Sequence, residues 1–441
     1  MILTMKKNFF LLGLLSCVIL MGCSTSSDPD TETNPIDVLP DPIPDLSAEV
    51  EVYEPGLIHD DFVLAIENGG TEAYLLNKAG EKRYQWSFDK NLGNDFELLE
   101  DGKVLGIFKS DDPQITAGGF GGIIRLLGFE NSVLWEFEYS GPDYIAHHDV
   151  ERLSNGNFLI LVWERFDAST AQNFGVETTV SIIPDKIIEV DPSTNDIVWE
   201  WRVWDHLVQE LDPNKPNYGN VANNPQLINL NYTAGDGERV THINGFDVDE
   251  DNDLIYLSAN LFNEIWVIDH STTTIEAAGS SGGNYGKGGD LLYRFGNPRA
   301  YNNNEGAVLF DSNHHPNLID DGYPGAGNLM VYVNGNAVSQ STVYELEIPS
   351  SFTLQPDTNN EPNVVWSYTN EDLFFGRLSG VTRLSNGNTL ICEGDYGYWE
   401  VTPNGEVAWK YNGHMTTGGS FWRGYGYDKD HPAIITLGVR D

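Results

Sequence analysis

Cysteine and basic residues are scarce in this chain, which has three Cys among 441 residues and 24 Lys and Arg against 66 Asp and Glu. Two of the cysteines, Cys17 and Cys23, lie in an apolar N-terminal stretch. Cys392 alone remains in the body of the chain, so no intrachain disulfide is expected there. The formal charge of −42 repels polyanions, so we expect neither nucleic acid nor anionic lipid as a partner.

Long hydrophobic runs are also rare, and the run near the N-terminus predicts an export signal. Lys6 and Lys7 precede the apolar run Phe9–Leu20, which ends at the letters LMGC. This pattern is similar to a bacterial lipobox, so we predict a lipoprotein signal peptide over residues 1–22, removed before a lipidated Cys23. The protein would then be exported and lipid-anchored to a bacterial membrane, on the periplasmic or cell-surface side. A transmembrane helix is the alternative, which the shortness of the run disfavours.

The chain after the signal divides by composition into a linker and one large domain. Residues 23–50 are acidic and rich in proline, which predicts an extended tether with little surface to bury. Residues 51–441 hold all 11 Trp and nearly all of the 45 Gly, a composition typical of turn-rich β-proteins. We therefore expect one β-domain over 51–441.

An aromatic strand pattern recurs along this domain, and hairpin turns accompany it. RLSNGNFLIL (152–161) and RLSNGNTLIC (383–392) are nearly the same segment, and LLEDGKVLGI (98–107) is a looser copy. Asn-Gly or Asp-Gly between apolar runs predicts type I′ hairpins, in which both central residues need a positive φ. The aromatic strands are YQWSF (84–88), VLWEF (133–137), IVWEW (197–201), LLYRF (291–295), VVWSY (364–368) and EVAWKY (406–411).

This repeat predicts an all-β fold, a six-bladed β-propeller closed by its N- and C-terminal strands. The strand at 406–411 lacks partners of its own after it, so strands at 62–69 and 72–80 would complete that unit and close the ring. A β-sandwich and a seven-bladed ring are the alternatives.

Four of the ten histidines form two doublets, His147–His148 and His314–His315. In a propeller, the strand before each hairpin turn is the innermost of its blade, so the hairpin glycines offer a common reference. Counting back eight residues from each of the two hairpin glycines, Gly156 and Gly322, reaches His148 and His314.

The same reference assigns the corresponding position in the other repeats. It falls on Asn94, Ser379 and, after an allowance for a longer turn, His242. We therefore expect His148, His242 and His314 to point into one space at a mouth of the central channel. Because side chains alternate along a strand, the other members of the doublets should face away.

Three convergent imidazoles can support two kinds of chemistry. They can hold zinc with an open fourth position, although no HxH or HExxH spacing preassembles such a site here. Alternatively, a neutral imidazole can act as a nucleophile while neighbouring N–H groups stabilise developing negative charge.

Several further segments resemble the bacterial arylsulfotransferase (aryl-sulfate sulfotransferase) family. They include NEIWVID, FGNP and DGYPGAGN, within a similarity that extends from Asp61 to Ala433. The resemblance implies a six-bladed propeller that moves a sulfuryl group from a phenolic sulfate ester to a phenol without a sulfonucleotide. It also implies ping-pong transfer through a sulfohistidine.

Carried onto this sequence, the resemblance makes His314 the nucleophile and places His242 and His148 beside it as donors to the sulfuryl oxygens, with His147 as a further substrate contact. Asn260 stands where the family commonly has an arginine that holds the sulfate. Asn94, Ser379, Arg165 and Arg299 are further candidates for substrate binding, the two arginines as substitutes for the missing charge.

Other motifs give weaker signals. GGNYGKGGD (282–290) lacks the Ser or Thr of a phosphate-binding loop and precedes a strand, so a plain loop is expected. DVDEDND (247–253) suits a solvated acidic hairpin, with a structural Ca²⁺ site as the alternative. No cofactor is otherwise expected, and no oligomeric state is predicted. The alternatives to the enzyme are a propeller that binds a ligand, glycan or protein without turnover, and a His-coordinated metalloenzyme.

Overall fold

The computed structural model describes residues 43–235 and 237–440, which consist mainly of antiparallel strands. Two sheets combine strands from both ends of the described chain. In order across the sheet, the first consists of β1 (Val50–Tyr53), β24 (Val407–Tyr411), β23 (Gly397–Val401), β22 (Thr389–Glu393) and β21 (Gly380–Arg383). The second consists of β25 (Phe421–Asp428), β2 (Asp61–Glu67), β3 (Glu72–Leu76) and β4 (Lys82–Ser87). Two more sheets are simple meanders: β13 (Ile243–Asp249), β14 (Leu254–Ala259), β15 (Glu264–Asp269), β16 (Tyr293–Phe295); and β17 (Asn313–Leu318), β18 (Leu329–Val333), β19 (Thr342–Glu347), β20 (Asn363–Tyr368).

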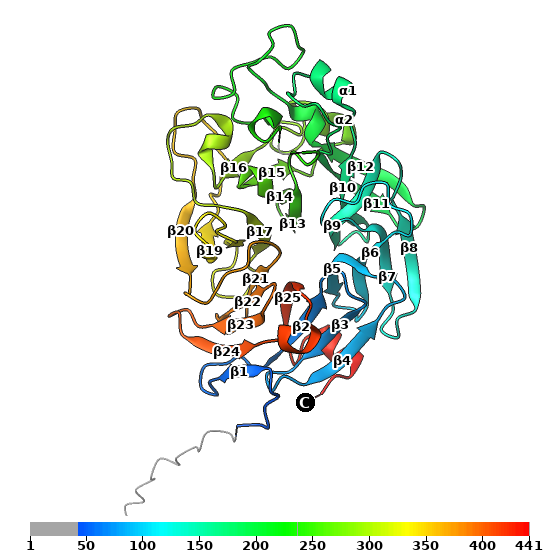
Figure 1. The fold of residues 1–441 in the computed structure, drawn as a ribbon, viewed down its shortest axis with the longest axis vertical. Coiled ribbons are helices and arrows are strands. Elements are labelled where there is room, and N and C mark those ends of the chain that lie inside the picture. Colours follow the sequence, from blue (N-terminus) through cyan, green and yellow to red (C-terminus); the bar gives the residue numbers. More distant parts are fainter. Residues whose placement is uncertain (1–42, 236, 441) are drawn as a thin grey trace, which may run out of the picture. The chain divides into compact units, whose positions relative to one another are not determined.

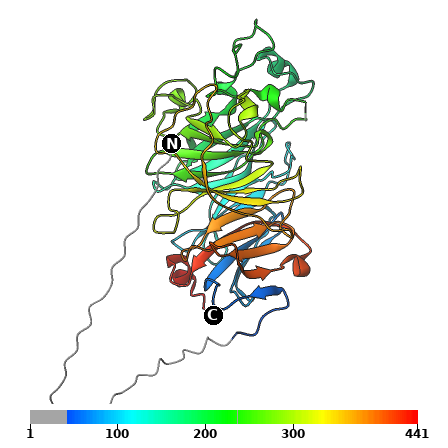
Figure 2. The same ribbon diagram turned by 90° about the vertical axis from the view of Figure 1, so that its left-hand side faces the viewer.

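An eight-stranded sheet consists of two further meanders joined at one point. The meanders are β5 (Leu92–Leu98), β6 (Val104–Lys109), β7 (Gly122–Leu127), β8 (Val133–Glu138); and β9 (Tyr144–Arg152), β10 (Phe158–Glu164), β11 (Asp185–Asp191), β12 (Asp196–Arg202). A single parallel bridge between Asn94 and His148 links them. The sheets are arranged around a common centre in a propeller-like manner (Figure 1), and Figure 2 shows them edge-on.

Short helices lie in the connections between strands, and one, α4, follows the last strand. They are α1 (Ala168–Asn173), η1 (Val203–His206), η2 (Leu230–Tyr232), η3 (Asn260–Phe262), α2 (Thr274–Ala277), η4 (Pro298–Tyr301), α3 (His414–Thr417) and α4 (Pro432–Leu437). No helix in the described part of the chain has the length and apolar character needed to cross a membrane.

The aromatic strands form as predicted, and each is the last strand of its meander. Five of the six, β4, β8, β12, β20 and β24, lie towards the rim in Figure 1, while β5, β9, β13, β17, β21 and β25 surround the centre. The outer strand β8 is largely exposed, whereas β2, which lies between β25 and β3, is almost entirely buried, as expected for an edge strand and an interior strand.

The predicted hairpins form, but their turn type differs from the prediction. In the turn of 152–161, Gly156 has a φ of 91° and donates its N–H to the carbonyl of Leu153, while Asn155 keeps a negative φ. The N–H of Leu153 also bonds to the carbonyl of Asn157. A type I turn followed by a left-handed glycine therefore replaces type I′. The glycine was predictable because only it adopts this φ freely.

The predicted partners of the N-terminal strands were wrong. The strand 407–411 (β24) pairs with β1 at 50–53, whereas β2 pairs with β25 at 421–428 and with β3. The segment FWRGYGYD of β25 was not predicted as a strand, because it carries two glycines and no following hairpin turn. Its pairing with β2 joins a C-terminal strand to an N-terminal one.

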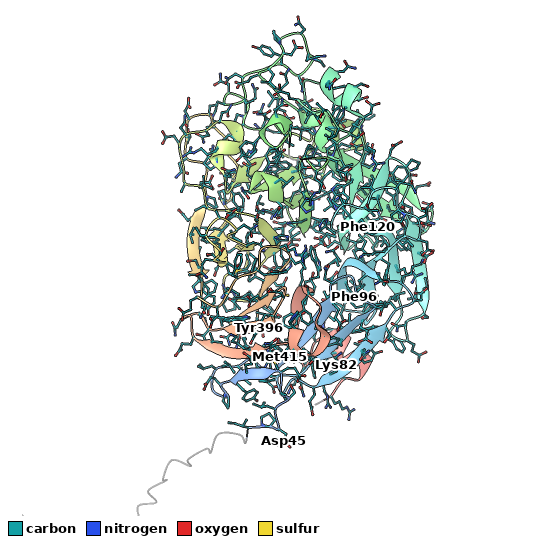
Figure 3. All side chains as sticks on the ribbon, in the orientation of Figure 1. Asp45, Lys82, Phe96, Phe120, Tyr396 and Met415 are labelled. Carbon is teal, nitrogen blue, oxygen red and sulfur yellow. The ribbon has the colours of Figure 1, made fainter. Side chains whose placement is uncertain are left out.

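The core fills the spaces between neighbouring sheets with aromatic and branched side chains. One cluster packs Trp86, Phe96, Phe108 and Trp422 together, with Trp86 and Phe96 ring centroids 5.6 Å apart. Figure 3 labels Phe96 on the inner strand β5 and Lys82 near the rim. Large rings held in this way fix the inner strands, which carry the candidate site.

The predicted signal peptide, the lipidated Cys23 and the first 20 residues of the predicted tether lie outside the described residues. Residues 43–49 of that tether have no regular strand.

Candidate functional site

The histidines singled out from the sequence approach one another near the centre of the molecule. The rings of His148 and His242 are 4.9 Å apart and nearly perpendicular. Trp422 of β25 contacts both His148, at 5.7 Å, and His314, at 6.4 Å between ring centroids. The three imidazoles therefore share one region, which inner elements of three sheets and β25 enclose.

The three histidines nevertheless do not occupy one equivalent backbone position, so that part of the prediction was wrong. His148 lies in a bulge of β9 between the paired residues Ala146 and Val150, and His242 precedes the first paired residue of β13. His314 is itself paired, opposite Tyr332. The bulges have different lengths, so a fixed count from the hairpin glycine does not measure register.

The bulges also affect the second member of each doublet. His315, with a φ of 51°, turns its ring towards Tyr425 in a separate cavity, as the prediction of opposite faces requires. His147 does not face away: its Nδ1 lies 2.8 Å from Nδ1 of His148, and its ring stacks on Trp163 at 3.8 Å. The left-handed φ of 54° at His148 breaks the alternation of side chains there.

The hydrogen bond of His314 defines which ring nitrogen is free. Its Nδ1 lies 2.6 Å from Oδ1 of Asn334, and the amide nitrogen of Asn334 donates to the carbonyls of Phe375 and Leu378. The amide oxygen is thus an acceptor, so Nδ1 of His314 carries the proton and Nε2 has a lone pair. Burial lowers the pKa of His314 to about 4, so the ring is neutral at neutral pH.

Several buried nitrogens in this region have no hydrogen-bond partner among the described residues. They include Nδ1 of His242 and Nε1 of Trp163, whose ring centroids lie 5.9 Å apart. Buried polar atoms are rarely left unpaired, so these atoms mark a place for a hydrogen-bonding ligand. Burial, followed by the charge of Arg239, holds the pKa of His242 well below its usual value.

The remaining predicted site residues divide by location. Asn260 lies close to His242, since its backbone N–H bonds to the carbonyl of His242, but its side chain donates to the carbonyl of Asn313 at 3.0 Å. Arg165 bonds to the carbonyls of Pro142 and Gln114, and Arg299 to those of Asn303 and Gly306. Neither arginine makes a contact with the histidines.

Asn94 and Ser379 are both buried, and the side chain of each forms a hydrogen bond with another segment of the chain. The amide of Asn94 donates to Asn68 at 3.1 Å, and its backbone pairs with His148. The hydroxyl of Ser379 accepts from the N–H of Gly394 at 3.0 Å. Of the two, Asn94 is the one held directly beside a histidine.

A buried arginine that the sequence did not single out supplies the positive charge near the histidines. Arg423 on β25 donates to both carboxylate oxygens of Asp149, at 2.8 and 3.1 Å, and lies 3.4 Å from Asp95. Burial opposes its charge, but Asp149, Tyr425 and Asp95 outweigh that effect and raise its pKa. Arg423 lies in the segment RGYGYDKDHPA, but nothing in that segment shows that the guanidinium reaches the centre.

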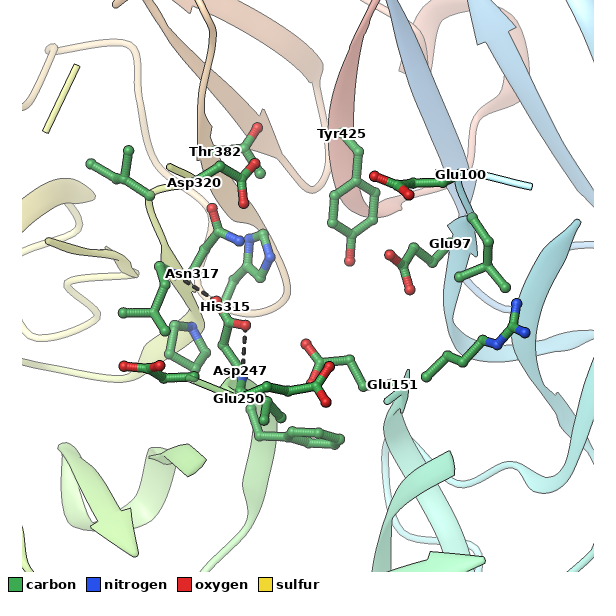
Figure 4. Close-up of a pocket in the computed structure, with 18 of the residues that line it drawn as sticks. Glu97, Glu100, Glu151, Asp247, Glu250, His315, Asn317, Asp320, Thr382 and Tyr425 are labelled. Atoms are coloured by element: carbon green, nitrogen blue, oxygen red, sulfur yellow. Dashed lines mark hydrogen bonds between the residues drawn. The ribbon is translucent and has the colours of Figure 1, made fainter. Parts of the chain in front are cut away.

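Arg423 also lines an acidic cavity of about 1050 Å³. Figure 4 shows inner strands of different sheets contributing Glu97, Glu151, Asp247, Asn317 and Tyr425 to it. Burial first, and then the neighbouring carboxylates, raise the pKa of Glu97 to about 8. Burial likewise raises the pKa of Asp247 to about 7.

In the described ranges, no three His, Cys, Asp or Glu side chains are positioned to hold a metal ion. This holds for the three histidines, which the metalloenzyme alternative requires, and for the acidic hairpin at 247–253.

Comparison with known proteins identifies one family. A model described as Arylsulfotransferase (ASST) matches residues 49–417. No curated protein matches the chain. Among solved structures, a protein of unknown function from Bacteroides caccae is 11% identical, with a TM-score of 0.47, over 84% of this chain and 99% of its own. Raptor from Chaetomium thermophilum is 10% identical, with a TM-score of 0.42, over 80% of this chain and 24% of its own.

Proposed function

The chain belongs to the arylsulfotransferase family, and from this premise we propose that it transfers a sulfuryl group from a phenolic sulfate ester to a phenol through a sulfohistidine at His314. The observation that carries the proposal is the hydrogen bond from His314 to Asn334, which leaves Nε2 unprotonated in a neutral ring. An unprotonated imidazole nitrogen is the form that can attack.

The first half-reaction forms the covalent intermediate. The lone pair on Nε2 of His314 attacks sulfur, the bond between sulfur and the aryl oxygen breaks, and the phenolate leaves with the electron pair. The orphaned Nε1–H of Trp163 and the adjacent His242 support this step, because N–H donors aimed at the sulfuryl oxygens stabilise the charge that spreads over them.

The second half-reaction reverses the first with another phenol. The acceptor oxygen attacks sulfur, the nitrogen–sulfur bond breaks, and the electron pair returns to Nε2 of His314. The phenol proton must pass to a base. Trp422, which contacts the rings of His148 and His314, offers an aromatic surface on which an aryl ring can pack.

The same proposal includes the number of blades, the closure of the ring and the cellular location of the protein. We propose that the four-stranded units form six blades of one ring, closed through the pairing of β25 with β2. We also propose that the chain is exported and lipid-anchored through Cys23. Metabolic labelling with a fatty acid checks the anchor: label incorporation that is lost in Cys23→Ser supports it, and equal labelling of both proteins contradicts it.

A second function, ligand binding without turnover, is favoured by one observation. Asn260 is uncharged and its amide is already bonded to the carbonyl of Asn313, so it does not replace a sulfate-holding arginine. In that case a phenolic sulfate would bind without being cleaved.

One assay separates the two functions. The protein is incubated with 4-nitrophenyl sulfate and phenol, and nitrophenol release is compared for the wild type, His314→Ala and the exposed-histidine control His414→Ala. Transfer predicts release by the wild type and the control, with a loss of at least about 10³-fold in His314→Ala. Equal release by His314→Ala would remove His314 from the reaction, and no release by the wild type would favour binding alone.

A further inference from the structure

Asp185, at the start of β11, connects two of the histidines from behind. It is completely buried. Its Oδ2 accepts from the N–H of Ile243 at 3.1 Å and from the hydroxyl of Thr241, the two neighbours of His242 in the chain. Its Oδ1 lies 3.0 Å from Nε2 of His147. One carboxylate therefore holds both the backbone around His242 and the ring of His147.

Nε2 of His147 and Oδ1 of Asp185 lie 3.0 Å apart without meeting the criteria of a hydrogen bond. Neither Nε2 of His147 nor Oδ1 of Asp185 has another partner within residues 43–235 and 237–440. Both groups are fully buried, where an unpaired polar atom is costly. A bare Nε2 would place a lone pair against an anionic carboxylate, so Asp185 favours the tautomer of His147 with its proton on Nε2.

A proton on Nε2 of His147 determines the proton positions in the row formed by Asp185, His147 and His148. With its proton on Nε2, a neutral His147 presents a lone pair at Nδ1. Nδ1 of His148 lies 2.8 Å away and must then be the donor. Nε2 of His148 is left unprotonated, and it makes no hydrogen bond to any described residue.

We propose, on the basis of the function proposed above, that Asp185 and His147 are positioning residues that keep the proton of His148 on Nδ1, so that Nε2 of His148 accepts the proton of the acceptor phenol. In the second half-reaction the phenol O–H bond breaks and its proton binds Nε2 of His148. The proton on Nδ1 of His148 can then move to Nδ1 of His147. The resulting imidazolium lies against Asp185, and the proton returns to water when the product leaves.

The surroundings of His148 explain why such support is needed. Burial, His242, His147, His314 and Arg423 all lower the pKa of His148. Burial also lowers the pKa of His147, but Asp185 opposes that effect. A positive charge is thus less costly on His147 than on His148. Proton transfer from His148 to His147 places this charge beside the carboxylate of Asp185.

The test separates the two half-reactions. Without acceptor, the burst of nitrophenol reports sulfuryl transfer to the protein, and added phenol reports transfer out. Asp185→Asn should change the burst rate by less than about threefold and slow transfer to phenol by about 10²–10⁴-fold, the usual contribution of a general base. The defect should shrink with acidic phenols that are already ionised at the assay pH.

Two further variants accompany Asp185→Asn. His147→Phe keeps a ring on Trp163 but has no nitrogen, and it should show the same selective loss. Asp191→Asn, on the same strand, changes a carboxylate that bonds to Ser193 at the surface, and it should leave both rates unchanged. Equal slowing of both half-reactions by Asp185→Asn, with no dependence on phenol acidity, would overturn the inference and indicate a merely structural role.

The burst and the chemical shifts distinguish failure of this inference from failure of the proposed function. A wild type without a burst contradicts the proposed function itself. Nitrogen chemical shifts of ¹⁵N-histidine in the wild type test the inference even if both variants fail to fold. A proton on Nδ1 of His148 is expected, and a proton on Nε2 with Nδ1 bare would overturn it.

Discussion

At the scale of single residues, the two doublets look alike in the sequence and differ in what surrounds them. His314 bonds to an amide oxygen, His148 to another histidine, and His315 accepts from the N–H of Val381 at 3.0 Å. The sequence predicted that His148, His242 and His314 approach one another, because the repeat indicates which strands are innermost, but it did not predict that His147 joins them. It did not predict the role of Asn334, because this residue begins an Asn-Gly pair after β18, which indicates only a turn.

Replacement of Asn334 should weaken the nucleophile without unfolding the protein. Asn334→Ala removes the acceptor that holds the proton on Nδ1 of His314, so part of the population loses the lone pair on Nε2. We expect the burst rate to fall about tenfold, which corresponds to a free energy of about 1.4 kcal/mol. Asn336→Ala, two residues further and exposed, is the control and should keep the wild-type burst.

The pH dependence of the first half-reaction follows from the pKa of His314. Burial lowers this pKa to about 4, and only the neutral ring attacks, so the burst rate should stay level as pH falls and drop only near pH 4. An exposed histidine would lose activity near its usual pKa of about 6.5. An acid limb near that higher value, measured by rapid-quench kinetics, would mean that His314 is not buried in this way.

At the scale of elements, the hairpins and aromatic strands were predictable and the bulges were not. A strand is recognised in the sequence by the alternation of its apolar residues, and a left-handed turn by its glycine. A bulge adds a residue to an inner strand without any such signal, and it decides where His147 and His148 point. Because β25 carries two glycines and no hairpin turn, Arg423 was missed along with the strand that holds it.

One glycine in the loop between β6 and β7 leaves room for the ring of His148. Gly119 has a φ of 96°, and its carbonyl accepts from the N–H of His148. A Cβ at this position would lie 2.0 Å from Cε1 and Nε2 of the His148 ring. Gly119→Ala should therefore displace the ring and slow transfer to phenol by about tenfold or more.

A neighbouring glycine provides the control for this loop. A Cβ on Gly118 would meet no atom within 4 Å, so Gly118→Ala should leave both half-reactions unchanged. If Gly118→Ala and Gly119→Ala had the same effect, the loop rather than the contact with His148 would be responsible.

At the scale of the whole molecule, the excess of acid has a structural consequence in the central cavity. Carboxylates of neighbouring inner strands lie so close together that burial and mutual repulsion raise their pKa values, to about 7 for Asp95 and about 8 for Glu97. Composition predicted a surface that repels polyanions. It could not predict that acids from separate repeats would share one cavity, because that depends on the bulged strands that aim them.

Folding stability should accordingly fall as pH rises from about 4 towards 8. A carboxyl group with a raised pKa binds a proton in the folded state where the unfolded chain has lost it, so its contribution is complete below about pH 4 and is lost as pH rises through the folded value of about 8 for Glu97. Glu97→Gln should therefore raise the free energy of unfolding at pH 8 by about 1–2 kcal/mol, after allowance for water in the cavity. The gain should shrink towards pH 5.

Urea unfolding at both pH values measures this difference. Glu100→Gln, an exposed side chain at the same cavity, is the control and should change little at either pH. A Glu97→Gln gain of the same size at pH 5 and pH 8 would show that ionisation of Glu97 is not its source.

Sulfohistidine formation is tested most directly by the mass of the peptide that contains His314, after brief exposure of the protein to 4-nitrophenyl sulfate without acceptor. We expect this peptide to gain the mass of one SO₃ group on His314 and to lose it when phenol is added. An unmodified His314 peptide in a protein that still releases nitrophenol, or the added mass on another residue, would show that His314 is not the nucleophile.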